Sequence, residues 1–382
     1  MSEPVSQPPG RPPDGQAPAS AVIVGTGLIG TSVALALRAR GVTVWLTDAD
    51  PAAARLAADI GAGQVLPDGA EALPEGPADI AVLAVPPAAV AATLAAVQPR
   101  GLARWYTDVA SVKSQPLRQA AELGCDLASF VPGHPLAGRE RSGPAAARAD
   151  LFLGRPWVVC PGGGNPVPGV GAVAALARAC GAEPVLASPA EHDAWVALVS
   201  HAPHVVSAAM AARLTEARDG ALAVAGQGLR DVTRIAAGDT RLWLQILAAN
   251  AAPAADVLAA VGADLIAVAE ELAETAAGAG PAPELKLLAA LLDQGVTGVA
   301  RLPGKRGAPA RSETQVQVVI RDQPGELARL FQAAGEAGVN IEDVGIEHSP
   351  GLPVGVAELT VRPDAVGRLT DALAANGWPV RR

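Results

Sequence analysis

Three glycines that follow a buried apolar run are the first residues whose spacing suggests chemistry. Ala21 to Val24 is apolar, and Gly25, Gly27 and Gly30 come after it in the spacing GxGxxG, with a helix expected to open at once. The first glycine allows a tight turn, the second lets backbone N–H groups approach a pyrophosphate, and the third lets helix and strand pack closely. The pattern predicts a dinucleotide site. Its predicted cofactor contacts are Gly25, Gly27, Leu28, Ile29, Gly30, Asp48, Val85, Pro86 and Ser111.

An acidic residue after the second apolar run indicates which dinucleotide binds. Asp48 lies where a carboxylate can accept hydrogen bonds from the adenosine ribose, and it would repel a 2'-phosphate. We therefore expect NAD as the cofactor rather than NADP. Asp50 also lies near this position, but because it precedes Pro51 we expect it to cap a helix.

Histidine and arginine residues further along the chain have the types needed for proton transfer and for holding a carboxylate. His134 could take a proton near pH 7 as a neutral imidazole. Arg230 and Arg234 are one helical turn apart, and a planar guanidinium can hold a carboxylate through two parallel hydrogen bonds. His201 and His204 also lie one turn apart, but no third ligand follows at a recognisable spacing, so we predict no metal site.

Four motifs, in this order, resemble those of prephenate and arogenate dehydrogenases, which are enzymes of tyrosine biosynthesis. They are TDVASVK at 107–113, GHPLAG at 133–138, SHAPH at 200–204 and RDVTRIA at 230–236. The resemblance covers Ala21 to about Leu302. It implies an α/β Rossmann domain that binds NAD, followed by an all-α dimerisation domain and therefore a homodimer.

The resemblance also implies roles for residues of these motifs. In that family the histidine of GHPxxG contacts the ring hydroxyl of the substrate, so His134 is the expected catalytic residue, and Ser111 is expected to support it. The second arginine of RDxTRIA, here Arg234, is expected to hold a substrate carboxylate. The other expected substrate contacts are His204, Ser200, Trp243 and Arg139.

Two positions depart from the family pattern. Arg139 follows Gly138 where many relatives have a small polar residue, and Gln227 stands where a second glycine is common. Both leave the details of the substrate open, and Arg139 offers an additional carboxylate contact. Trp243 fits a helical core as well as a pocket wall.

The implied reaction is the oxidative decarboxylation of prephenate to 4-hydroxyphenylpyruvate. As hydride leaves C4 for the nicotinamide, a base takes the hydroxyl proton, and loss of carbon dioxide then makes the ring aromatic. Arogenate, the amino analogue, is an alternative substrate. A β-hydroxyacid dehydrogenase is a second alternative, although it would need a catalytic lysine in the helical part, where only Lys286 occurs. A non-catalytic sensor of NAD and amino acids is a third.

The elements that must position these residues follow from length and periodicity. At 382 residues the chain is long enough for two or three domains. Short apolar runs alternate with Ala-rich helical stretches up to about Leu186, which is typical of βαβ units and a mainly parallel sheet. From Ser188 to about Leu292 only helical spacing occurs. The predicted strands of the first part are Ala21–Val24, Val42–Leu46, Ile80–Val85, Trp105–Val109 and Trp157–Cys160.

Two motifs follow a Pro/Gly/basic stretch, IRDQPGEL at 320–327 and AGVNI at 337–341. They resemble those of an ACT domain, a small α+β sandwich that often senses amino acids. We predict strands at Val316–Ile320 and Val354–Val361 and helices at Gly325–Ala337 and Asp364–Ala375. Free N–H groups at the first strand-to-helix turn can take an amino-acid carboxylate. The resemblance to enzymes of tyrosine biosynthesis implies L-tyrosine, the end product of that pathway, as the effector. A dimerising module without ligand is the alternative. The predicted regulatory residues are Asp322, Pro324, Gly325 and Asn340.

Charge and cysteine content narrow the partners and the compartment. The formal net charge of −9 argues against nucleic acid as a partner. The uncharged stretch from Ile80 to Pro99 is broken by two prolines, so we expect a strand and a helix there, not a membrane span. The start has no apolar segment typical of a signal peptide, and three cysteines without a CxxC pair suit a cytoplasmic protein.

The predicted domain organisation has five parts. They are a disordered Pro-rich tail at 1–19, an NAD-binding Rossmann domain at 20–187, a helical substrate and dimerisation domain at 188–300, a linker at 301–313 and an ACT-like regulatory domain at 314–382.

Overall fold

The computed structural model describes residues 15–66, 73, 76–139, 141–278, 285–302, 314–348 and 354–381 of the chain. The chain forms two compact units, Met1–Gly262 and Ala263–Arg382, and the division falls within a long helix. Residues 1–14 of the predicted tail and 303–313 of the predicted linker lie outside the described residues.

The first unit begins with a doubly covered parallel sheet. Its elements are β1 (Ser20–Val24), α1 (Leu28–Arg38), β2 (Thr43–Thr47), α2 (Pro51–Asp59), β3 (Gln64–Val65), β4 (Ala78–Leu83), α3 (Val90–Val97), β5 (Ala103–Asp108), α4 (Ser114–Glu122) and α5 (Val167–Ala179). The strand order is β3-β2-β1-β4-β5, with every pair parallel. This is the order of a dinucleotide-binding half, so the α/β prediction is confirmed.

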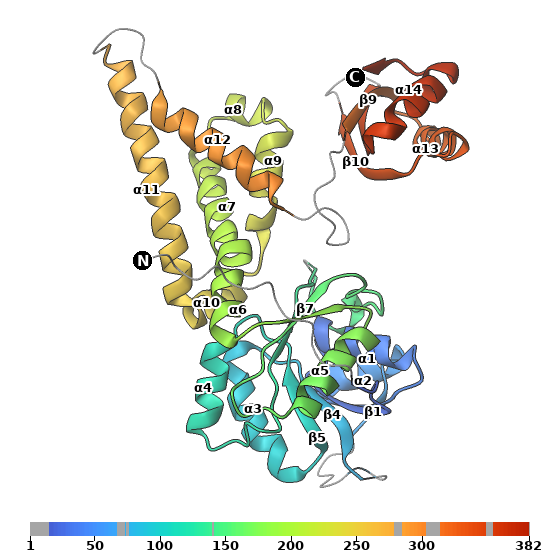
Figure 1. Cartoon of the computed structure of the whole chain (residues 1–382), viewed down its shortest axis with the longest axis vertical. Helices are drawn as coiled ribbons and strands as arrows, with labels where there is room; N and C mark the ends of the chain where they lie inside the picture. The colour runs from blue at the N-terminus through green and yellow to red at the C-terminus, as the bar shows by residue number, and fades with distance from the viewer. Residues whose placement is uncertain are drawn as a thin grey trace. The chain divides into compact units, whose positions relative to one another are not determined.

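Helices cover both faces of this sheet, which explains the continuous apolar sequence of β1. Ile23 packs in the cluster that includes α1 and α5, whereas the neighbouring Val22 packs with α3 and α4. Figure 1 shows these two pairs of helices on opposite faces of the sheet. Both side chains are fully buried. The central strand is therefore held from both sides, and its carboxyl end is a rigid place from which to build a site.

A second sheet of three short strands adjoins the first. It contains β6 (Gly133–Pro135), β7 (Pro156–Val159) and β8 (Glu183–Leu186), with β6 antiparallel to β7 and β8 parallel to it. A bridge from Tyr106 of β5 to Phe130 connects the chain leading into β6 with the large sheet. Of these three strands, only β7 is predicted from the sequence. The three residues of β6 include a glycine and a proline and show no alternation of apolar and polar side chains.

The remainder of the first unit is helical, as predicted. Its elements are α6 (Pro189–Val196), a π-helical turn (Ala197–His201), α7 (Ala202–Ala212), α8 (Asp219–Ala223), α9 (Gln227–Thr233), a 3-10 turn (Arg234–Ala237) and α10 (Thr240–Ala249). A capping box starts α6, in which Ser188 and Glu191 exchange side-chain and backbone hydrogen bonds. Pro189–Glu216 and Ala251–Ala276 are long and apolar enough to span a membrane by length and composition alone.

The helix α11 (Ala251–Ala276) crosses the division between the units, and α12 (Lys286–Ala300) follows it. The carboxylate of Glu271 accepts hydrogen bonds from the N–H groups of Leu287 and Leu288, at 2.9 and 3.0 Å. This carboxylate therefore caps the start of α12 and fixes it against α11.

The end of the chain forms a four-stranded antiparallel sheet with helices. Its elements are β9 (Thr314–Arg321), α13 (Glu326–Glu336), β10 (Ile341–His348), β11 (Val354–Val361), α14 (Val366–Ala375) and β12 (Val380–Arg381), in the strand order β10-β11-β9-β12. Alternate residues of β9 are buried beneath α13 and α14. The small α+β sandwich is therefore present. Strand β10 is not predicted from the sequence, because polar residues and Gly345 interrupt its apolar pattern.

We expect Asn165→Ala to destabilise the first unit, because this side chain ties the loop after β7 to the segment that enters β6. Its Nδ2 donates to the carbonyl oxygens of Leu127 at 2.7 Å and Phe130 at 2.9 Å, and its Oδ1 accepts from the N–H of Gly162 at 2.7 Å. Loss of these bonds should lower the free energy of unfolding by about 1 to 3 kcal/mol. Urea unfolding measures this, with the exposed Asn376→Ala as the control that should change little.

Candidate functional site

The glycine turn between β1 and α1 has the shape of a phosphate cradle. Gly25 has a φ of +99°, and a Cβ there would lie 2.4 Å from the carbonyl oxygen of Ala84. A Cβ on Gly30 would lie 2.0 Å from the oxygen of Gly25. Around Gly27, by contrast, no atom lies within 4 Å of the Cβ position, and α1 starts without a side-chain cap. The first N–H groups of α1 are therefore open to a pyrophosphate.

Asp48 follows β2 and bonds to the same turn. Its Oδ2 accepts from the N–H of Thr26 at 2.5 Å and from the hydroxyl of Thr26 at 2.9 Å, and its Oδ1 accepts from the N–H of Asp50 at 2.9 Å. Oδ1 retains a lone pair for a ribose hydroxyl. Asp50 itself accepts from the N–H of Ala52 and caps α2, as the sequence indicates.

The other predicted cofactor contacts lie at the same edge of the sheet. Leu28 and Ile29 are the first residues of α1, and Val85 and Pro86 come just after β4. Ser111 follows β5 and is half-buried. The carboxyl ends of parallel strands form the crevice in which dinucleotides bind, and the residues present here fit an NAD molecule.

Beside this edge, three side chains form a hydrogen-bonded row that we call the acid–imidazole triad: His134, His192 and Asp193. Nδ1 of His134, on β6, lies 2.8 Å from Nε2 of His192, on α6. Nδ1 of His192 lies 2.9 Å from Oδ1 of Asp193. His192 and Asp193 are buried, whereas His134 is only half-buried. Nε2 of His134 makes no hydrogen bond to any described residue, so this nitrogen is available to a ligand.

A buried ion pair fixes the backbone that carries His134. Nζ of Lys113 donates to Oδ2 of Asp108 and, at 2.7 Å, to the carbonyl oxygen of Gly133. Oδ1 of Asp108 accepts from the N–H of Gly133 at 3.2 Å. A Cβ on Gly133 would lie 2.9 Å from Nε1 of Trp157, so a larger residue does not fit before His134 without displacing that ring.

Asn250, which follows α10, joins the triad to a second histidine. Its Nδ2 donates to the backbone carbonyl of Asp193 at 2.8 Å and to Nδ1 of His201 at 3.0 Å. Because Nδ1 of His201 accepts this bond, a neutral His201 carries its proton on Nε2. The π-helical turn that ends at His201 places this ring within hydrogen-bond distance of Asn250, and such turns are frequent at functional sites.

His204 and Trp243 form a stacked pair next to His201. The ring centroids of His204 and Trp243 are 3.6 Å apart and the planes differ by 10°. His201 meets the indole edge-on at 6.2 Å. A Cβ on Gly238 would lie 2.5 Å from Nε1 of Trp243, so the stack depends on a glycine there.

Apart from His204 and Trp243, four predicted catalytic or substrate residues also lack a hydrogen bond to the triad within the described part of the chain. Ser111 makes no such bond to His134, whose partner is His192. Ser200 is half-buried in the π-helical turn, and Arg234 is exposed at the start of the 3-10 turn after α9. Arg139 is also exposed, and its NH1 donates to the carbonyl of Ala146 at 3.1 Å.

His192, Asp193 and Asn250 are the residues of this cluster that sequence reasoning did not select. A signal for the first two exists: an adjacent imidazole and carboxylate stand in an otherwise apolar helical run that also contains His201. Polar residues in a buried helix need partners, so such a pair marks a candidate network.

Burial keeps the histidines of this cluster neutral. It lowers the pKa of His134 well below its ordinary value, and the nearby positive charge of Lys113 lowers it further. Burial also lowers the pKa of His192, against the opposing effect of Asp193, and lowers that of His201 to about 4. At neutral pH, the imidazole of His134 is therefore unprotonated.

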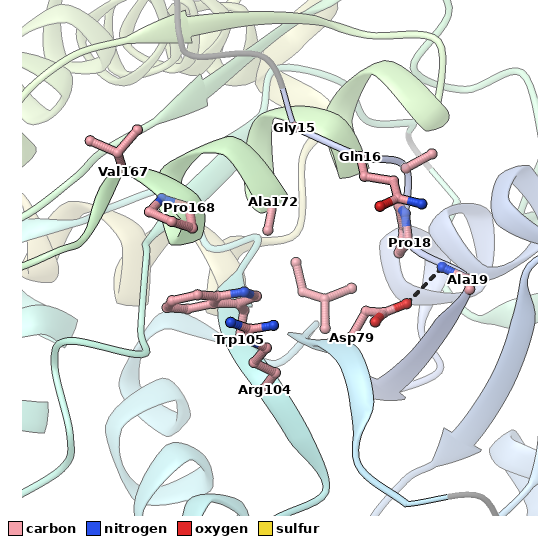
Figure 2. A pocket seen from close by; sticks show the side chains of 12 residues that line it. Gly15, Gln16, Pro18, Ala19, Asp79, Arg104, Trp105, Val167, Pro168 and Ala172 are labelled. Atoms are coloured by element: carbon pink, nitrogen blue, oxygen red, sulfur yellow. Dashed lines mark hydrogen bonds between the residues drawn. The ribbon is translucent and has the colours of Figure 1, made fainter.

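A cavity of about 530 Å³ lies at the opposite, amino edge of the sheet (Figure 2). Residues 15–19 form part of its wall, and Oδ2 of Asp79 accepts from the N–H groups of Ala19 at 2.7 Å and Ser20 at 3.1 Å. None of the predicted site residues lines this cavity. It is therefore separate from the triad and from the glycine turn.

Two family models match the chain in succession. The one described as the nucleotide-binding domain of prephenate dehydrogenase matches residues 33–186, and the one described as its dimerization domain matches residues 188–279. The chain is 42% identical over 364 residues to probable prephenate dehydrogenase NovF of Streptomyces niveus. That match covers 94% of this chain and 99% of the relative.

Two further relatives support the comparison. The chain is 33% identical to cyclohexadienyl dehydrogenase of Zymomonas mobilis, over 64% of this chain and 85% of the relative. The structure of prephenate dehydrogenase from A. aeolicus in complex with hydroxyphenyl propionate and NAD+ has a TM-score of 0.63 and 24% identity. It covers 73% of this chain and 97% of that chain, and it supports the fold.

We expect the histidine cluster to make stability fall on acidification. Unfolded histidine has a pKa of about 6.5, and the pKa of folded His201 is about 4. Between these values the unfolded state binds more protons, so the free energy of unfolding decreases as pH falls. His201→Gln keeps an acceptor for Asn250 but does not titrate.

Urea unfolding of both proteins at several pH values tests this, because the comparison cancels the titration of all other groups. The variant should gain stability relative to the unmodified protein as pH falls from about 6.5 to about 4. A constant difference across that range would contradict a buried, neutral His201.

Proposed function

The chain belongs to the prephenate dehydrogenase family, and on this premise we propose that it oxidises and decarboxylates prephenate to 4-hydroxyphenylpyruvate, with NAD as the hydride acceptor. Arogenate is the alternative substrate, and its product would be tyrosine. The observation that carries the proposal is a neutral imidazole, His134, held at the nucleotide edge with Nε2 available. The catalytic role of His134 and the substrate contacts named below are part of this proposal.

In the proposed reaction His134 takes a proton from the substrate and later returns it to the product. NAD, when held at the glycine turn, would supply the acceptor for the hydride on C4. His134 takes the proton of the C4 hydroxyl as the carbonyl forms. The ring carboxylate leaves as carbon dioxide, and the electrons of its carbon–carbon bond make the ring aromatic. His134 then returns its proton to the C4 oxygen, so a neutral phenol forms and no proton is released overall.

Substrate binding and orientation fall to the helical part. We assign a substrate carboxylate to Arg234, whose exposed guanidinium can make a bidentate contact. His204 and Trp243 offer a flat stacked surface to the ring, and Ser200 a hydroxyl. Ser111 would bond the C4 hydroxyl together with His134. Arg139 remains a candidate for the second carboxylate.

The helical part also exposes apolar surface that a second copy of the chain would bury. Val224 is 81% exposed and Leu244 63% exposed, and apolar residues of α11 and α12 are similarly open. Such surface on a soluble enzyme marks an interface. Together with the match to a dimerization domain, it supports a homodimer. Burial in such an interface would also explain why the segments Pro189–Glu216 and Ala251–Ala276 are long and apolar, without any need for a membrane.

The free thiols of Cys125, Cys160 and Cys180 suit a cytoplasmic enzyme.

The C-terminal sandwich is proposed as an ACT-like regulatory domain that responds to L-tyrosine. Gly325 has a φ of +87° and begins α13, as the predicted turn requires. A ligand carboxylate there would lie near the buried Glu326, whose oxygens already accept from Trp378 at 2.8 Å and Arg329 at 2.8 Å. Whether L-tyrosine inhibits the enzyme distinguishes a regulatory domain from a purely structural one. Pro324, Asp322 and Asn340 belong to the same proposed site.

The function is tested by supplying prephenate or arogenate with NAD or NADP and following reduction of the nicotinamide. We expect turnover with prephenate and NAD, and a preference for NAD over NADP because of Asp48. Asp48→Ala should weaken NAD more than NADP. Absence of turnover with either substrate would refute the proposal, and equal use of NADP would refute the role of Asp48.

Substitution of the proposed base should affect turnover rather than cofactor binding. We expect His134→Asn to lower kcat by about 10²- to 10⁴-fold with little change in the Kd for NAD. Arg234→Gln should instead raise KM for the substrate, since a charged hydrogen bond contributes about 1.5 to 3 kcal/mol in both ground and transition states. Steady-state kinetics and NAD titration separate the two, and retained turnover in His134→Asn would contradict the assignment.

Removal of the C-terminal domain should separate catalysis from regulation. A chain ending at Arg301 should keep dehydrogenase activity and lose most inhibition by L-tyrosine, since the coupling of about 1 to 3 kcal/mol corresponds to about 5- to 150-fold in affinity. Inhibition curves for both lengths measure this. Equal inhibition of both, or none in the full chain, would mean that the domain is structural or answers to another ligand.

A further inference from the structure

Behind the proposed base lie two buried side chains to which nothing above gives a role in the reaction. We propose that His192 and Asp193 are positioning residues: they fix the tautomer of His134 so that Nε2 faces the substrate as a base, and they stabilise the imidazolium that forms there. The second half of this inference rests on the proposed function, whereas the tautomer is a property of the protein alone.

The tautomer follows from the order of donors and acceptors along the triad. An ionised Asp193 can only accept, so Nδ1 of His192, 2.9 Å from its Oδ1, must carry a proton. A neutral His192 then has an unprotonated Nε2, which can only accept. Nδ1 of His134, 2.8 Å away, must therefore be the donor. The remaining nitrogen of neutral His134, Nε2, is left with its lone pair free.

Asp193 remains ionised because its oxygens are bonded to N–H groups. Its Oδ1 also accepts from the backbone N–H of Lys113, and its Oδ2 from that of Ser114, both at 2.8 Å. Burial acts to raise the pKa of Asp193, but hydrogen bonds from His192, Ser114 and Lys113 outweigh it, so the pKa is lowered. A carboxylate fixed in this way is a permanent acceptor at the far end of the triad.

The burial of the triad suits a proton that is held and returned. The side chain of His192 is fully buried and that of Asp193 is 5% exposed, so a proton on His134 has no route to water through them. The negative charge of Asp193 offsets the imidazolium through His192. The other charged or titratable groups that face the two rings are Lys113 and Asp108, which neutralise each other, and His201.

A purely structural role is the competing explanation, since Asp193 also anchors α6 to the loop at 113–114. The two explanations differ in the variant His192→Gln. A glutamine amide can donate to Asp193 and accept from His134, so it can preserve the tautomer, whereas phenylalanine in His192→Phe fills the space and can do neither.

The first measurement is ¹⁵N NMR of the imidazoles in the full-length protein, which contains five histidines. The variants His134→Asn and His192→Gln assign the signals. At neutral pH we expect His134 to be protonated on Nδ1 in the unmodified protein and in His192→Gln, and to shift toward Nε2 protonation in His192→Phe. An unmodified His134 protonated on Nε2 would overturn the proposal whether or not the protein turns over prephenate.

The second measurement is turnover. We expect His192→Phe to lower kcat by about 10- to 100-fold, the range found for partners that orient metal-binding histidines, with the Kd for NAD unchanged, and His192→Gln to recover part of the loss. In Asp193→Asn the acid limb of kcat/KM should move to lower pH, because the imidazolium loses its compensating charge. An unmoved limb, or equal losses in the two His192 variants, would overturn the positioning role. An inactive unmodified protein with the expected tautomer would refute the proposed function instead.

Discussion

A carboxylate buried without a lysine or arginine of its own must have its lone pairs filled by N–H donors, and Asp193 meets this requirement from two directions. The backbone of the loop after β5 donates to it, and so does the ring of His192 on its own helix. The backbone carbonyl oxygen of Asp193 accepts a hydrogen bond from Nδ2 of Asn250. A single residue thus joins the nucleotide-binding fold to the helical part, and the position of His134 depends on that junction.

The same loop carries a second buried charge, the ammonium group of Lys113, which is paired with a carboxylate of opposite charge. Lys113 has its ammonium group paired with Asp108 and its N–H bonded to Asp193, so one residue connects the end of β5, the start of β6 and α6. Breaking a buried pair by removal of one partner typically costs about 3 to 5 kcal/mol. Such a network is expensive to disturb, and it holds the ring of His134 at a fixed place beside the nucleotide edge.

Local patterns were enough to predict the parts of the fold that local physics determines. The glycine spacing, the apolar β1 and the cap at Asp50 each depend on a few neighbouring residues. The alternation of strands and helices along the chain is likewise predicted from short stretches of sequence. Strand β6 could not be predicted in this way, because its three residues are held by β7 and by Asp108. His134 was predicted, but its partners His192 and Asp193 were missed for the same reason: 58 residues separate His134 from His192, and only the folded chain shows that they bond.

Helix α11 adds a dependence on protein concentration. It has 26 residues, and of these only Ala254 is buried, while Leu265 and Ile266 are more than half exposed. A long helix with so little of its surface buried against the described residues gains little from tertiary packing, which is the usual source of helix stability in proteins. In the proposed homodimer the missing contacts come from another molecule. The stability of the helical part would therefore depend on the concentration of the protein. Dilution would then loosen the helical part, and with it the residues proposed to hold the substrate, before the nucleotide-binding sheet is affected.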